Sequence, residues 1–164
     1  MFPLSSITVN ARGGTTLGNF LSDSYSSSGF GANDFDWSDY DLIIVEFGLN
    51  NKDNTITADN FSALVSRIRG FNSTAKIVFV RSSHKEFTTQ LPSIFESICS
   101  KDRDCCWIDL TNTEFGNLDA LHYHGKVPEE TPTSGTAQID YAHFTKRGYL
   151  EKAYVVASLI GQKL

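Results

Sequence analysis

The chain has no long run of one charge. Its 14 lysine and arginine residues are outnumbered by 19 acidic residues, and the net charge is -5. Partners of nucleic acid or of anionic membrane surfaces usually carry a basic patch, so we exclude both as the main partner. An apolar stretch long enough to cross a bilayer is also lacking, and we therefore expect no membrane span.

Cysteine is scarce, with Cys99, Cys105 and Cys106 only. No second Cys or His pair lies at zinc-ligand spacing, so we expect neither a metal nor a cofactor. Two states of the thiols stay open: buried and reduced, or a disulfide from Cys99 to Cys105 or Cys106, which requires an oxidising compartment. Such a disulfide, with the glycosylation sequons at Asn60 and Asn72, favours an extracellular or secreted location.

The rest of the composition is typical of a folded globular protein. Apolar residues make up 40% of the chain and charged residues 20%, without internal repeats or low-complexity tails. A chain of 164 residues can bury a sizeable core without disulfides or metals, so we predict a single domain over residues 1–164. We expect Trp37 and Trp107 to anchor the core or loops rather than to stack on sugars.

Apolar segments with strand and helix periods alternate along the chain. The predicted strands are Ile7–Ala11, Asp41–Phe47, Lys76–Val80 and Cys106–Leu110. Asp41–Phe47 is a nearly continuous apolar run, which predicts burial on both faces, and Lys76–Val80 is predicted to be another buried strand. The predicted helices are 17–21, 57–69 with Thr57 as its N-cap, 91–100 and 145–160, with irregular loops over 22–39 and 111–139. This alternation predicts an α/β fold with a doubly wound parallel sheet, in which ligands bind beyond the carboxyl ends of the strands.

Three segments bring glycine or polar residues to that edge of the predicted sheet. Gly14 follows the first predicted strand, and Gly48 and Asn50 follow the second. Asp140 and His143 precede the last predicted helix, in a loop. In an Asp-x-x-His pair, the carboxylate can hold one imidazole nitrogen while the other nitrogen acts as a general base. Such a pair is two-thirds of a nucleophilic triad.

In this order the segments resemble three blocks of the SGNH (GDSL-like) hydrolase family of serine esterases. Val9–Thr15 is similar to the second block, Glu46–Asn51 to the third and Asp140–His143 to the fifth. The resemblance covers about Ile7 to Ile160. It implies a three-layer α/β/α, flavodoxin-like fold and hydrolysis of acyl or acetyl esters, including esters on glycans.

The resemblance also implies a role for each of four residues. His143 would take the proton of a serine nucleophile, and Asp140 would fix the tautomer of His143. The Gly14 backbone N–H and the Asn50 side-chain amide would donate hydrogen bonds to the oxyanion. Glycine suits position 14 because a Cβ would hinder the close approach of a substrate to the backbone.

The family's first block, Gly-Asp-Ser on the first strand, has no counterpart before Gly14, and Asn51 stands where the third block usually has Asp. In the family that first strand lies inside the sheet. Its loss would leave apolar strand edges exposed, which proteins normally avoid. We therefore expect an upstream segment to complete the sheet, or a neighbouring subunit to do so by strand addition. The alternative is that the fold has rearranged around the loss.

The serines of this chain are poor substitutes for the missing nucleophile. Ser5 and Ser6 precede the first predicted strand, at the wrong end of the sheet. Ser82 and Ser83 lie at the correct edge, at a position that the family does not use for its nucleophile. Two functions remain: an ester hydrolase whose serine lies outside this chain, or an inactive SGNH-like module that is a structural or glycan-binding subunit of a larger assembly.

Overall fold

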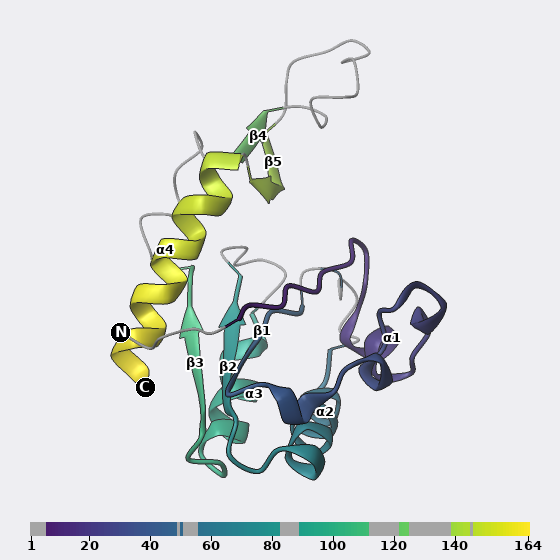
Figure 1. Cartoon of the computed structure of the whole chain (residues 1–164). Coiled ribbons are helices and arrows are strands. Elements are labelled where there is room, and N and C mark those ends of the chain that lie inside the picture. Colours follow the sequence, from purple (N-terminus) through teal and green to yellow (C-terminus); the bar gives the residue numbers. More distant parts are fainter. Residues whose placement is uncertain are drawn as a thin grey trace.

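The computed structural model describes residues 6–48, 50, 56–82, 89–111, 122–124, 139–144 and 146–164. Its centre is a three-stranded parallel sheet in the order β1-β2-β3 (Figure 1). The strands are β1 (Leu42–Val45), β2 (Lys76–Arg81) and β3 (Cys105–Asp109). A parallel sheet with helices between its strands confirms the predicted α/β class.

Four α-helices are described: α1 (Leu17–Leu21), α2 (Ala58–Phe71), α3 (Leu91–Cys99) and α4 (Lys146–Lys163). Helix α2 begins at its predicted cap, where the Thr57 hydroxyl accepts a hydrogen bond from the Asn60 N–H at 3.3 Å. The loop over 22–39 contains three 3-10 turns, η1 (Ser26–Ser28), η2 (Ala32–Asp34) and η3 (Trp37–Asp39). Within the ranges listed above, no helix is long and apolar enough to cross a membrane.

Strand β2 is buried on both faces, as its continuous apolar sequence predicts. Ile77 and Phe79 belong to one buried cluster, whereas Val78 and Val80 belong to another that includes Ile160 of α4. Because successive strand residues point to opposite faces, the two clusters lie on opposite sides of the sheet.

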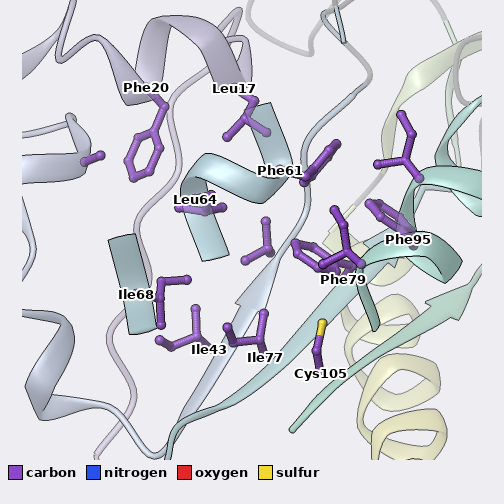
Figure 2. Packing of buried hydrophobic residues seen from close by; sticks show 14 of the residues in the cluster. Leu17, Phe20, Ile43, Phe61, Leu64, Ile68, Ile77, Phe79, Phe95 and Cys105 are labelled. Atoms are coloured by element: carbon purple, nitrogen blue, oxygen red, sulfur yellow. The ribbon is translucent and has the colours of Figure 1, made fainter. Parts of the chain in front are cut away.

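The larger cluster is built around aromatic rings (Figure 2). Phe61 of α2 contacts Phe79 of β2 and Phe95 of α3, with ring centroids 5.3 and 5.1 Å away. Trp37 is buried in the same cluster, and its indole N–H donates to the Ala32 carbonyl at 3.0 Å. Trp107 packs against the cluster at Phe95. Both tryptophans are therefore anchors of the core, as predicted.

The prediction of a first strand over Ile7–Ala11 is wrong. This segment is not in a strand, and the side chains of Ile7 and Val9 are 72% and 81% exposed. The prediction that Asp41–Phe47 is buried on both faces is also wrong, because Ile44 is 49% exposed. One physical reason explains both results: in the described sheet β1 is an edge strand that pairs only with β2, and no strand lies between it and Ile7–Ala11.

A second, two-stranded antiparallel sheet contains β4 (His122–His124) and β5 (Ile139–Phe144). Figure 1 shows it beyond the amino-terminal end of α4, apart from the parallel sheet. The predicted loop before α4 is therefore partly a strand, and the stretch 111–139 is not wholly irregular. Aromatic and β-branched residues such as Ile139, Tyr141 and Phe144 favour a strand when a partner such as β4 is present.

Candidate functional site

A groove of about 490 Å³ runs along the free edge of β1. All four residues of β1 line it, and because successive residues of a strand face opposite ways, the groove follows the edge rather than one face. Residues Asn10, Ala11 and Arg12 of the extended amino-terminal segment also line it, as do Tyr149 and Lys152 of α4. Its size is within the range of small-molecule sites.

Asn50 joins the two turns that sequence analysis placed at one edge. Its side-chain Nδ2 donates a hydrogen bond to the Thr15 carbonyl at 3.2 Å, although the two residues are 35 positions apart. Asn50 and Thr15 both line the groove. The turn after Ala11 and the turn after β1 therefore meet beside the groove.

The two turns contain glycines for different reasons. Gly14 has φ +72°, and a Cβ added there would meet no atom within 4 Å, so the backbone conformation rather than space inside the chain requires glycine. Gly48 has φ +127°, and a Cβ there would lie 2.9 Å from Leu91 Cδ1. Gly48 is therefore required by both conformation and packing against α3.

Thr15 presents a buried hydroxyl without a partner. The residue is 4% exposed, and among the described residues nothing hydrogen-bonds to its Oγ1. A buried polar group without a hydrogen bond costs about 1–3 kcal/mol of stability. Thr15 was not predicted from the sequence as a site residue. The one indication of it there is its place directly after Gly13-Gly14.

An ion pair fixes α4 at the rim of the groove. Lys152 Nζ donates to both carboxylate oxygens of Glu46, at 2.6 and 2.7 Å. The Lys152 side chain is only 16% exposed, so solvent screens this pair less than a fully exposed one. The pair was not predicted from the sequence, where the one indication is that Glu46, a charged residue at the end of an apolar strand, needs a partner.

Ser82 follows β2 and lines the same groove, at the edge predicted for it. It is 5% exposed, and it lies next to Arg81, which is paired with Asp109 of β3 at 3.0 Å. Asp109 also accepts hydrogen bonds from the N–H and hydroxyl of Thr111. Ser6 is exposed, and Ser5 and Ser83 fall outside the described residues.

The backbones of Asp140 and His143 lie in β5, not in a loop at the start of α4. The prediction that these two residues lie in a loop before the last helix is therefore wrong, because their backbone pairs with β4. Their side chains, and the whole of Asn51, lie outside what the structure describes, so the dyad remains a prediction.

The side chain of Asn50, which lines the described groove, has amide N–H groups that can donate hydrogen bonds. Over the described ranges, no group of three or more His, Cys, Asp or Glu side chains is arranged to hold a metal ion. No protein-family model, curated protein or solved structure matches this chain.

Proposed function

We propose that this chain is an SGNH-type ester hydrolase domain, acting on acyl or acetyl esters, whose nucleophilic serine comes from an upstream segment or a neighbouring subunit. The hydrogen bond between Asn50 and the Thr15 carbonyl carries the proposal. It holds beside one groove the two turns that, by resemblance, supply the oxyanion donors.

The chemistry of Asn50 agrees with this role. A carboxamide has two N–H hydrogens, and the bond to Thr15 uses one of them. The other can donate to a substrate oxygen, together with the Gly14 backbone N–H. A donor aimed at a developing oxyanion lowers the barrier by about 3–4 kcal/mol.

The free edge of β1 supports the claim that a strand is supplied from elsewhere. Parallel sheets normally have both faces covered, and an edge with exposed apolar residues invites pairing. A strand seated in the groove, parallel to β1, would cover Ile44, which is 49% exposed. Its carboxyl end would then lie near Asn50, and the completed sheet would have the doubly wound SGNH arrangement in three α/β/α layers.

In the proposed reaction, the oxygen of the supplied serine bonds to the ester carbonyl carbon while its proton passes to His143. Asp140 holds the other ring nitrogen of His143. Because both residues lie in β5, apart from the parallel sheet, the proposed reaction requires that β5 move to the groove when the sheet is completed. The alcohol leaves with the proton from His143, which forms an acyl-serine intermediate. Water then attacks that intermediate, and the same residues release the acid and regenerate the serine.

The alternative is a catalytically inactive SGNH-like module that is a structural or glycan-binding subunit of a larger assembly. The exposed edge of β1 favours this alternative, because it needs a partner whether or not a reaction occurs. Both functions require the sheet to be completed. They differ in whether the completed assembly hydrolyses esters.

The test uses the native assembly, in which the completing segment is present. It combines labelling by a fluorophosphonate probe with hydrolysis of p-nitrophenyl acetate. We expect labelling of one serine and a roughly 100-fold lower rate in Asn50→Ala. Gln162→Ala removes an exposed carboxamide near the end of α4 and should leave the rate unchanged. An assembly that is intact but neither labelled nor active would refute the hydrolase and leave the inactive module.

A further inference from the structure

Two cysteines meet where α3 leads into β3, at the opposite end of the strands from Asn50. Cys99 is the last residue of α3 and Cys105 is the first of β3. Their Sγ atoms are 2.9 Å apart. A disulfide bond is about 2.05 Å long, so less than an ångström of side-chain movement separates this pair from a bond.

The connecting turn holds the two thiols in place. The Cys99 carbonyl accepts the Asp102 N–H at 3.3 Å, and the Asp102 carbonyl accepts the Cys105 N–H at 3.0 Å. The Asp102 carboxylate accepts the Asp104 N–H at 3.0 Å and Arg69 Nε at 2.7 Å. Because the turn is tied to itself and to α2, little chain entropy is lost when the sulfurs join.

The two sulfurs differ in chemistry. A hydrogen bond from the Cys105 thiol lowers the pKa of Cys99 more than burial raises it. The same hydrogen bond, together with burial, raises the pKa of Cys105 well above its usual range. The half-buried Cys99 is therefore the sulfur that ionises first and attacks an oxidant, while the buried Cys105 follows.

We propose that Cys99 and Cys105 form an intrachain disulfide on exposure to a low-molecular-weight disulfide. The Cys99 thiolate attacks one sulfur of the oxidant, which gives a mixed disulfide and releases one thiolate. Cys105 then loses its proton to solvent and attacks the Cys99 sulfur, which releases the second thiolate. Two protein thiols are oxidised, and one small disulfide is reduced to two thiols.

Cys106 provides an internal control. It follows Cys105 in β3, and it packs against the other buried cluster, on the opposite face of the sheet. Burial raises the pKa of Cys106 above its ordinary value. Although Cys106 is the immediate neighbour of Cys105, its side chain points to the opposite face of the sheet. Its raised pKa also makes it a weaker nucleophile than Cys99.

The experiment treats the full chain with oxidised glutathione, blocks the remaining thiols with iodoacetamide and maps tryptic peptides without reduction. Lys101 and Arg103 lie between the two cysteines, so trypsin cuts the loop, and its two ends stay together only through a disulfide. We expect this cross-linked pair in the wild-type chain and in Cys106→Ser. The total mass should fall by two hydrogens before alkylation.

Cys99→Ser should lose the cross-linked pair completely. Cys105→Ala should also lose it and retain glutathione on Cys99, because the resolving sulfur is gone. Circular dichroism of each variant establishes that it is folded. A folded wild-type chain that alkylates at all three cysteines after oxidation would overturn the proposal, as would a cross-link that requires Cys106.

Discussion

Replacing Asn72 by alanine should lower the free energy of unfolding by about 3 kcal/mol. The Asn72 side chain lies where α2 ends and holds the chain before β1 to the chain before β2. Its Nδ2 donates to the Tyr40 and Trp37 carbonyls, at 2.9 and 3.2 Å. Its Oδ1 accepts the backbone N–H groups of Ala75 and Thr74, at 2.9 and 3.1 Å.

The magnitude follows from these four hydrogen bonds. Each contributes about 1 kcal/mol net, and the cost rises where a buried partner is left unpaired. Ala75 is 1% exposed, so its N–H has no ready replacement, whereas Thr74 is exposed and water can replace its bond. For a chain of this length, a loss of 3 kcal/mol corresponds to a decrease in Tm of about 6–12 °C.

The assay is thermal and urea unfolding followed by circular dichroism. Ser73→Ala, an exposed change in the same turn, is the matched control and should stay within about 0.5 kcal/mol of the wild type. Asn72→Asp keeps the acceptor oxygen but places a carboxylate against the carbonyls, so at pH 7 it should be at least as destabilised as Asn72→Ala. If Asn72→Ala has the same Tm and the same free energy of unfolding as Ser73→Ala, the hydrogen bonds of Asn72 do not support the fold as described.

The same contacts bear on glycosylation. Asn72 heads one of the two sequons that sequence analysis associated with secretion. A glycan is attached to Nδ2, the atom that donates to the carbonyls before β1. In the folded chain Asn72 is therefore a structural residue, and its sequon is a weaker indication of secretion than the motif alone suggests.

Three further substitutions test the fold at other points. Burial alone would raise the pKa of Asp102, but the hydrogen bonds from Arg69 and the Asp104 N–H, together with the positive charge of Arg69, lower that pKa overall. Asp102→Asn should therefore lower the free energy of unfolding by about 1 kcal/mol at pH 7. Urea unfolding measured at a series of pH values should show this difference from the wild type disappear as the pH falls through the lowered pKa of folded Asp102. Gly48→Ala should cost about 1–3 kcal/mol because of its positive φ and the contact with Leu91, whereas Gly70→Ala in α2 should stabilise by about 0.5–1 kcal/mol. Equal melting temperatures for these two glycine variants would contradict the geometry at Gly48.

The elements that could be predicted from the sequence are those specified by local signals. The Thr57 cap and the period of α2 are contained in neighbouring residues, and the apolar run of β2 needs no distant information. The Ile7–Ala11 segment has equally good strand residues, yet it is not a strand. A strand exists only with a hydrogen-bonded neighbour, and pairing is a non-local property.

The candidate site also has one part that could be predicted from local sequence and one part that could not. Gly14 and Asn50 could be placed together because both follow β-prone segments of a predicted parallel sheet, and the structure joins their turns. The pair between Glu46 and Lys152 spans 106 positions and has no local pattern. Asp140 and His143 precede a helical pattern, which suggested a loop, but pairing with β4 makes that segment a strand.

The free edge of β1 also affects how the chain behaves in a cell. Among the described residues, the outer edge of β1 has no strand partner and lies beside exposed isoleucine, which is the kind of surface that aggregates or is retained by chaperones. We propose that a separate segment covers this edge. The abundance of soluble chain would then be set by the supply of whatever completes the sheet. Co-expression with the correct segment should raise the soluble yield, so yield itself becomes a screen for the missing strand.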